Sequence, residues 1–198
     1  MTFAANANYA VRLLLYYGFA RHLPSSVAPG KILWRRLRSW ICRPLFADCG
    51  DNINIERGAY IARGRTISIG SNSSIGINAA VGAYTRIGSN VMMGPEVLVF
   101  TRNHSTDRVD TPMIMQGYEE TAPVTIGDDV WIGARVIILP GVSIGSSTVL
   151  GAGAVVAKDV PAGSVVVGNP GRVVRNRYSP ISRAARRRVA GIELPKAQ

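Results

Sequence analysis

The chain is poor in the residues that build disulfide frameworks and zinc sites. Its 198 residues include two cysteines, Cys42 and Cys49, and two histidines, His22 and His104. Two cysteines are too few for a disulfide framework or a tetrathiolate site, and two histidines cannot form a three-histidine zinc centre. We therefore expect no catalytic metal, and two free thiols in a reducing compartment.

The chain also lacks a long apolar run and a secretory signal. The apolar stretch at residues 10–20 is too short to span a bilayer and contains Arg12. Nothing before Arg12 is basic, whereas a secretory signal begins with a basic segment. We expect a cytoplasmic protein, with contact to the inner membrane face as the option that its basic ends leave open.

Acidic residues are scarce: 12 Asp and Glu stand against 23 Lys and Arg, for a formal net charge of +11. The basic residues cluster at 31–43 and 172–188. Such an excess suits nucleic acid, an anionic membrane face or a polyanionic small molecule. No aromatic-rich nucleic-acid module accompanies the basic clusters, so we expect no nucleic-acid partner.

What the chain has instead is an apolar, mostly branched residue at every sixth position. Two runs share this spacing: Ile69, Ile75, Val81, Ile87, Met93, Val99, and then Ile126, Ile132, Ile138, Ile144, Leu150, Val156. A helix repeats at 3.6 residues and a strand at two, so neither explains a sustained period of six. A solenoid does, because each hexad supplies one short strand and one corner, and stacked coils share an apolar interior.

The hexads are interrupted twice. Ile55, Ile61 and Ile67 start the pattern, which then slips by two residues to Ile69. Val99 and Ile126 lie 27 positions apart, which is not a multiple of six. We therefore expect residues 100–123 to leave the coil as a polar loop, and long loops in regular chains are usually functional.

The segment before the repeats is predicted to be helical. Two apolar faces emerge from its spacing: Val11, Leu14, Leu15, Gly18, Phe19, and then Ile32, Leu33, Leu37, Trp40, Ile41. Arginines interrupt the second face, and Pro44 ends this basic amphipathic helix. Two roles stay open: a cap on the first coil, or peripheral membrane contact through residues 9–43.

These patterns divide the chain into three parts. Residues 1–48 form an amphipathic helical segment, residues 49–175 form the solenoid with its extruded loop at 100–123, and residues 176–198 form a basic tail. Past Val156 the repeat decays into a terminal strand at 165–167, and residues 168–171 turn the chain away from the coil. Residues 180–190 are expected to form a short basic helix or a frayed tail.

An ordered set of short segments resembles one family. The segments are Asn103-His104, Gln116-Gly117, and residues 129–134, 138–141, 158–161 and 168–170. In this order, over residues 53–175, the chain resembles the hexapeptide-repeat acyltransferases, and within them the sugar and polysaccharide O-acetyltransferases. The resemblance implies a left-handed parallel β-helix with three hexads per coil, acetyl-coenzyme A as co-substrate, a sugar or glycan acceptor, and a homotrimer with sites shared between protomers.

Acetyl transfer to a hydroxyl needs a base that takes the proton of the alcohol, and imidazole titrates near neutrality. His104 is the histidine of the extruded loop, and the resemblance marks it as that base. Asn103, Asp107 or a backbone carbonyl could orient its other ring nitrogen. The family also carries an asparagine near the acceptor, for which Asn78 and Asn103 are both candidates.

The resemblance further implies a groove for the pantetheine arm between neighbouring coils. The positions that match it are Trp131, Gly133, Ala134, Gly151, Ala152 and Ala157, while Lys158, Arg172 and Arg175 match basic positions that meet phosphates. Guanidinium and ammonium groups both suit phosphate. Small residues are also what tight corners need by themselves.

Two other functions stay open. The same fold and a loop histidine serve acetylation of an antibiotic or another xenobiotic. A non-catalytic β-helix scaffold would explain the repeats without any chemistry. Retention of coenzyme A binding and loss of turnover on replacing His104 would separate an enzyme from a scaffold.

Overall fold

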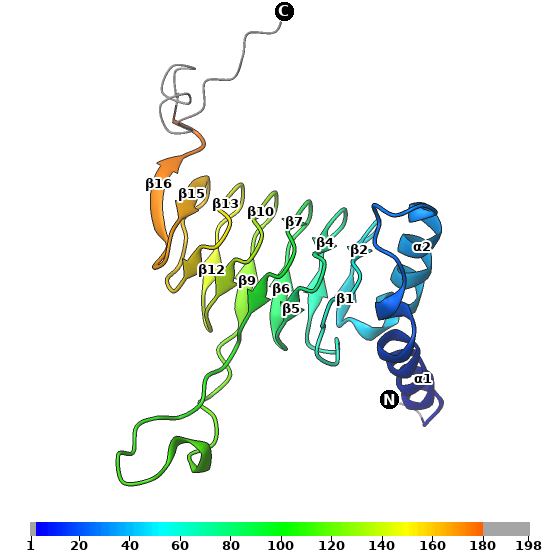
Figure 1. Ribbon diagram of the computed structural model, residues 1–198, viewed down its shortest axis with the longest axis horizontal. Coiled ribbons are helices and arrows are strands. Elements are labelled where there is room, and N and C mark those ends of the chain that lie inside the picture. The colour runs from blue at the N-terminus through cyan, green and yellow to red at the C-terminus, as the bar shows by residue number, and fades with distance from the viewer. Residues whose placement is uncertain (1–2, 180–198) are drawn as a thin grey trace, which may run out of the picture.

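The computed structural model describes residues 3–179, and its body is a left-handed parallel β-helix with three faces (Figure 1). The first face holds β1 (Asp48–Cys49), β3 (Ser68–Ile69), β6 (Thr85–Ile87), β9 (Val124–Ile126) and β12 (Ser143–Ile144). The second holds β2 (Asn54–Ile55), β4 (Ser74–Ile75), β7 (Met92–Met93), β10 (Trp131–Ile132), β13 (Val149–Leu150), β15 (Ser164–Val167) and β16 (Arg172–Asn176). The third holds β5 (Ala80–Val81), β8 (Leu98–Val99), β11 (Ile137–Ile138) and β14 (Val155–Val156).

Each strand pairs in parallel with the strand one coil later. Ile69 pairs with Ile87, and Trp131 pairs with Val149, so one regular coil takes three hexads. The hexad residues point inward, and several are less than 2% exposed: Ile69, Ile75, Ile126, Ile132, Ile138, Leu150. Full burial of such a side chain contributes roughly 1.5–3 kcal/mol, so the inward column is the main source of stability.

The corner between the first and second faces carries a ladder of asparagines. Asn52, Asn72 and Asn90 adopt φ values of 55°, 58° and 59°, a left-handed conformation that asparagine tolerates well. The Asn52 side-chain amide donates to Asn72 Oδ1 at 2.8 Å, and the Asn72 amide donates to Asn90 Oδ1 at 3.3 Å. These bonds tie successive coils together outside the core.

The first coil is longer than the others. Asp48 pairs with Ser68, an interval that exceeds three hexads by two positions, and the additional residues lie in the corner where Ala62 and Gly64 have φ of 47° and 76°. Ile67 is buried directly before β3. In the register that pairs Ile69 with Ile87, it corresponds to the buried Thr85 and not to a hexad residue. The prediction that Ile67 starts a hexad is therefore wrong, because the slip precedes it.

Residues 100–123 connect β8 to β9 and project from the coil (Figure 1). Ile87 of β6 pairs with Ile126 of β9, although the insertion separates these two strands in the sequence. Val99 likewise pairs with Ile138 across the same insertion. The loop is thus accommodated at a corner without disturbing the register of either face.

At the C-terminal end of the coil, the second face ends in a hairpin. The expectation that residues 168–171 send the chain away from the coil is wrong, because β16 returns antiparallel to β15, with Val165 opposite Arg175. This strand covers the edge that the last coil would otherwise leave open. The predicted helix or tail at 180–190 lies outside the described residues.

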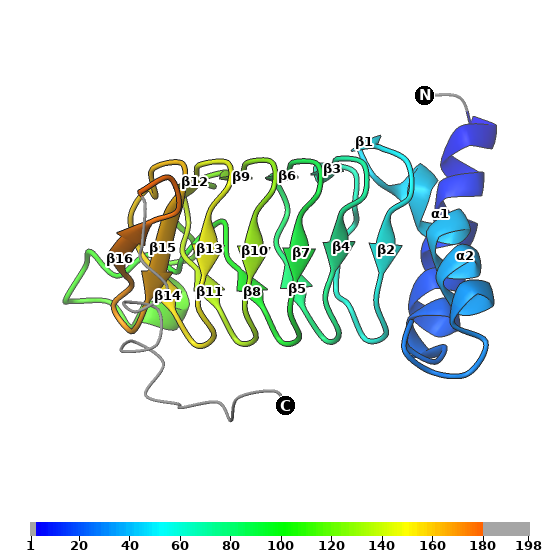
Figure 2. The same cartoon turned by 90° about the horizontal axis from the view of Figure 1, so that it is seen from above.

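Helices cover the other end of the coil (Figures 1 and 2). They are α1 (Phe3–Gly18), the short 3₁₀ turn η1 (Ala20–His22), α2 (Lys31–Cys42) and the turn η2 (Arg43–Leu45). Among the residues described, no helix is both long enough and apolar enough to cross a bilayer.

Tyrosines, rather than the predicted apolar face, attach α1 to the coil. The Tyr16 hydroxyl donates to Ala59 O at 2.7 Å, and the Tyr17 hydroxyl donates to Ala62 O at 2.6 Å. Burial raises the pKa of Tyr16 and raises the pKa of Tyr17 to about 12, so both hydroxyls stay protonated donors. Leu14, from the predicted apolar face, is 74% exposed.

A buried arginine attaches α2. Arg38 is fully buried and donates to the main-chain carbonyls of Leu23, Pro24 and Ile55. Its Nη2 lies 3.7 Å from Glu56 Oε2 and has no hydrogen-bond partner. Arg38 therefore joins the loop before α2 to the first coil.

Glu56 completes this junction as a carboxylate. It accepts hydrogen bonds from the Ser26 amide at 3.0 Å and the Asn54 side chain at 2.8 Å, and also from the Ser26 hydroxyl. Burial alone raises the pKa of Glu56, but these hydrogen bonds and the Arg38 charge outweigh it, so the pKa is lowered overall.

We predict that Glu56→Gln lowers the free energy of unfolding by about 1–3 kcal/mol at pH 7, because it leaves Arg38 without a buried counter-charge. The folded-state pKa is below the ordinary value of 4.5, so the carboxylate stabilises the fold above that pH and loses this effect in acid. Urea denaturation at pH 7 and pH 3.5 measures the difference. Glu120→Gln, on the exposed loop, is the control; a difference that does not shrink in acid contradicts the assignment.

Candidate active site

The base of the extruded loop is a short antiparallel stem that carries His104. Ser105 N donates to Gly117 O at 3.2 Å, Glu119 N donates to Asn103 O at 3.0 Å, and His104 bridges to Tyr118. His104 therefore belongs to the hydrogen-bonded stem of the loop instead of its tip. A side chain on such a stem is held more firmly than one on a free loop.

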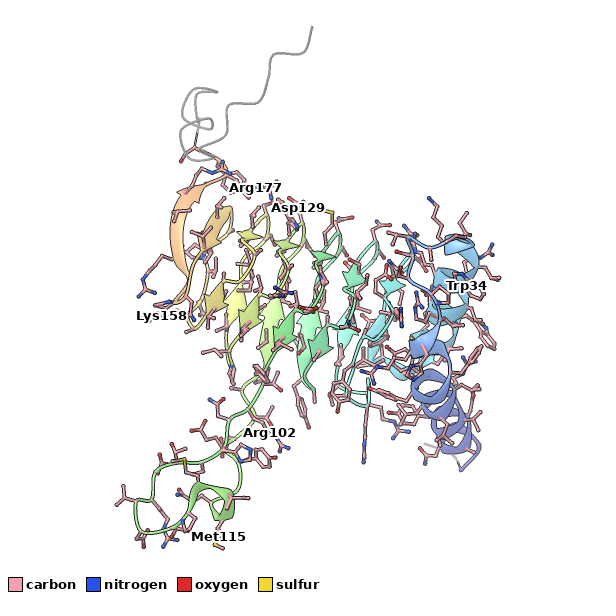
Figure 3. All side chains as sticks on the ribbon, in the orientation of Figure 1. Trp34, Arg102, Met115, Asp129, Lys158 and Arg177 are labelled. Carbon is pink, nitrogen blue, oxygen red and sulfur yellow. The ribbon has the colours of Figure 1, made fainter. Side chains whose placement is uncertain are left out.

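The imidazole is oriented by a main-chain carbonyl. His104 Nδ1 lies 3.2 Å from Gly117 O, and a carbonyl oxygen can only accept, so Nδ1 is the donor. In a neutral ring this leaves the lone pair on Nε2. The ring stacks on Tyr118 with centroids 4.2 Å apart. The Arg102 guanidinium lies 3.9 Å from the centre of the Tyr118 ring (Figure 3 labels Arg102). The arrangement holds the imidazole in a defined orientation and directs Nδ1 at the carbonyl.

Three groups were predicted to orient His104: Asn103, Asp107 or a main-chain carbonyl. In the structure the main-chain carbonyl of Gly117 contacts the imidazole. Within the described chain, neither the Asn103 side chain nor Asp107 hydrogen-bonds to the imidazole, and both are exposed. Asn78 lies at a different corner, between the second and third faces. The catalytic roles of Asn103 and Asp107 stay predictions.

Gln116 closes the outer part of the loop. Its amide nitrogen donates to Arg108 O and to Thr111 O, both at 2.7 Å, and its oxygen accepts from Arg108 N at 3.0 Å. The enclosed segment includes the 3₁₀ turn η3 (Met113–Met115), at the far end of the loop (Figure 3 labels Met115). The sequence pattern predicted no role for Gln116, although its place beside Gly117 in one of the family-like segments could have indicated one.

Four of the predicted donor-site residues gather at the corner between the second and third faces. A Cβ added to Gly133 would lie 2.6 Å from Ala152 N, and one added to Gly151 would lie 2.9 Å from Val167 Cγ1. Stacking of the coils therefore explains these two glycines without a ligand. Ala134 and Ala152 instead line a shallow surface hollow together with Pro95, Glu96, Arg135 and Gly153.

The other predicted donor residues lie elsewhere. Trp131 is exposed on β10, Ala157 and Lys158 follow β14 at the corner from which the loop leaves, and Arg172 and Arg175 lie on β16. Figure 3 shows Lys158 on the coil, separate from Arg102 on the loop. One chain thus does not bring the whole predicted set together with His104.

Arg177, which continues the basic series of β16, is engaged within the chain. Its Nη1 lies 3.2 Å from Asp129 Oδ2 and donates to Ser147 O at 2.8 Å (Figure 3). This ion pair ties the end of the hairpin to the corner between the first and second faces. Arg177 is therefore a weaker candidate for a phosphate than Arg172 or Arg175.

Metal ligands do not cluster in the described part of the chain. Within residues 3–179, no three His, Cys, Asp or Glu side chains lie where they could hold an ion. Cys42 is a buried free thiol whose pKa is raised by burial, and Cys49 is a partly buried free thiol.

The repeats are similar to those of a known protein family. The family profile described as bacterial transferase hexapeptide (six repeats) matches residues 123–158. Over 49 residues the chain is 47% identical to "Putative acetyltransferase YJL218W" of Saccharomyces cerevisiae, a match that covers 25% of this chain. It spans only 24% of that curated relative's length.

Two solved structures are similar over most of the chain. A galactoside acetyltransferase in complex with coenzyme A is 31% identical, with a TM-score of 0.71, covering 89% of this chain and 84% of that one. A maltose O-acetyltransferase from Clostridium difficile 630 is 31% identical, with a TM-score of 0.62, covering 90% of each chain. With 89% and 90% of this chain covered, both similarities extend well beyond the repeats at residues 123–158.

We predict that Gln116→Ala speeds trypsin cleavage after Arg108 by roughly 10-fold or more. The substitution removes three hydrogen bonds, each with a net contribution of about 0.5–1.5 kcal/mol, and limited proteolysis reports the population of the open loop. Thr106→Ala, at an exposed position of the same loop, is the matched control. Equal cleavage rates in the two variants would mean that Gln116 does not hold the loop closed.

Proposed function

The chain belongs to the hexapeptide-repeat acyltransferase family, and on that premise we propose that it is an acetyl-coenzyme A-dependent O-acetyltransferase acting on a sugar or glycan precursor. Two similar enzymes are named for galactoside and maltose, and one was solved with coenzyme A. The observation that carries the proposal is the His104 imidazole, whose Nδ1 is committed to Gly117 O while Nε2 is available.

His104 acts as the general base in this proposal. Acetyl-coenzyme A, when bound, supplies an acetyl group activated as a thioester. Nε2 takes the proton of the acceptor hydroxyl as that oxygen bonds to the acetyl carbon, and returns it to the sulfur as the carbon–sulfur bond breaks. The Gly117 carbonyl stabilises the transient imidazolium by accepting from Nδ1. A positioned base of this kind typically contributes 10²- to 10⁴-fold.

The hollow at Ala134 and Ala152 suits the donor. Its small side chains leave main-chain atoms accessible to an extended, unbranched chain such as pantetheine, and a Cβ added to Gly153 would meet nothing within 4 Å. We assign Lys158 and the β16 arginines to the phosphates, because ammonium and guanidinium groups bind them well. The buried free thiol of Cys42 supports a reducing, cytoplasmic location.

A second copy of the chain is needed to complete the site. The hollow lies at the corner between the second and third faces, whereas the His104 loop leaves the coil at the corner between the third and first faces. The two features therefore flank the third face. The outward positions of that face are apolar and half-buried (Ala80, Leu98, Ile137, Val155), whereas those of the first face are polar (Ser68, Arg86, Thr125, Ser143). At the loop tip, Ile114 is 86% exposed. We propose a homotrimer in which the loop of one protomer meets the hollow of its neighbour.

His104→Ala is expected to lower thiol release from acetyl-coenzyme A by 10²-fold or more, while coenzyme A binding measured by calorimetry changes less than about twofold. His22→Ala is the matched control, because His22 is the other histidine and lies in the helical segment. Turnover that persists in His104→Ala would remove the proposed base. A wild-type chain without affinity for coenzyme A would instead favour a scaffold.

Leu98→Asp is expected to dissociate the trimer, because it places a charge in the middle of the apolar outward row of the third face. Light scattering should fall from three times 21.2 kDa to a single chain, with loss of thiol release. Thr125→Asp, at an outward position of the first face, should leave the mass unchanged. A wild-type mass of one chain would contradict the shared site.

A further inference from the structure

The face of α1 that points away from the coil is apolar. Its exposed positions repeat at helical spacing and carry no charge: Ala7, Ala10, Val11, Leu14, Leu15, Gly18. Tyr16, by contrast, faces the coil and is buried. A helix on a water-exposed surface normally shows polar residues on its outer face. In α1, apolar residues occupy that face instead.

The outer face of α2 extends this apolar surface and adds cations. Ile32 is 66% exposed and Trp40 is 61% exposed, and both line a hollow with Arg35, Arg36 and Arg43. Arg12 of α1 links the two helices, because its guanidinium lies 4.9 Å from the Trp40 ring and donates to Trp40 O at 3.0 Å. We call the exposed residues of α1 and α2 together the end surface; Figure 2 shows both helices at the same end of the coil.

The charge of this segment is one-sided. Residues 1–47 contain seven Lys and Arg and no Asp or Glu, and so account for seven of the eleven net positive charges of the chain. Arg38 is buried beside Glu56, and Arg43 pairs with Asp51 at 3.0 Å. The other five, Arg36 among them, are at least partly exposed. A partner for the end surface must therefore bring both negative charge and an apolar phase.

We propose that the end surface docks onto an anionic phospholipid bilayer. Apolar side chains enter the acyl boundary while arginines meet lipid phosphates, as in interfacial amphipathic helices. A symmetric contact with a second copy is less favourable, because it would place cation against cation where the segment offers no carboxylate to pair them. Docking does not depend on acetyl transfer, and it leaves the coil and the C-terminal hairpin projecting from the membrane (Figure 1).

Co-sedimentation of the full-length protein with vesicles tests this proposal. We expect binding to vesicles made of two parts phosphatidylcholine and one part phosphatidylglycerol, weaker binding to phosphatidylcholine alone, and loss of the difference at high salt. The double variant Val11→Ser and Leu14→Ser should bind at least tenfold more weakly. Arg36→Glu should lose at least fivefold, and since Arg36 is exposed, it tests the surface without altering packing.

Matched controls lie away from the end surface. Val174→Ser on β16 removes an exposed apolar residue at the opposite end, and Arg86→Glu on β6 reverses a charge in the middle of the coil; both should bind within twofold of wild type. Thermal melting of every variant monitors folding. Wild-type protein that does not sediment with anionic vesicles overturns the proposal, as do controls that lose as much binding as the end-surface variants. A lower oligomeric mass of the Val11 and Leu14 variant, with vesicle binding unchanged, also overturns it and assigns the surface to a second copy.

Discussion

The pairing of each strand with the strand one coil later is the constraint on which the other features depend. Because this register is set by main-chain hydrogen bonds, equivalent residues of successive coils lie above one another. Inward aliphatic residues form one continuous column, and corner residues form continuous edges. A residue type that suits one coil therefore recurs along an edge, as the asparagine ladder and the small residues at Gly133 and Gly151 illustrate.

The same register allows a reactive loop to be added at little structural cost. The chain leaves after Val99 and re-enters at Val124, and the pairs on both faces continue as if nothing intervened. The loop then orders itself through its own stem and through Gln116. His104 is consequently oriented by a main-chain carbonyl, a group that no side-chain substitution at Gly117 removes.

At both ends of the coil, main-chain groups lack a neighbouring coil to pair with, and the two ends satisfy these groups differently. At the C-terminal end β16 returns on β15 and satisfies the open edge with main-chain bonds. At the N-terminal end one main-chain bond, from Gly58 N to Arg21 O, is joined by side-chain donors. Tyrosine hydroxyls and the Arg38 guanidinium donate to carbonyls of the first coil and of the loop before α2. The helices that bring these donors expose apolar residues on their other side, which is the surface that the membrane proposal addresses.

The solenoid, most of its inward residues and the position of the loop were predictable from the order of the amino acids. A period of six is a direct consequence of coil closure, and the interval between Val99 and Ile126 is incompatible with it. The family and the candidate base at His104 could also be predicted, because the short segments that resemble the family occur in the expected order along the chain.

The partners of these patterned segments, in contrast, depend on how the segments pack in three dimensions. Hydrophobic spacing identifies a stripe on α1 but not its partner, so the outward position of Leu14 and the packing role of Tyr16 became visible only once the helix was placed. Two further features, the enlarged corner before Ile67 and the return of β16, depend on main-chain conformations that many sequences can adopt. The sequence therefore did not indicate them. The contact between His104 and Gly117 O joins two separate backbone segments of the loop. Because every residue has a main-chain carbonyl, the sequence could not indicate which carbonyl would contact the imidazole.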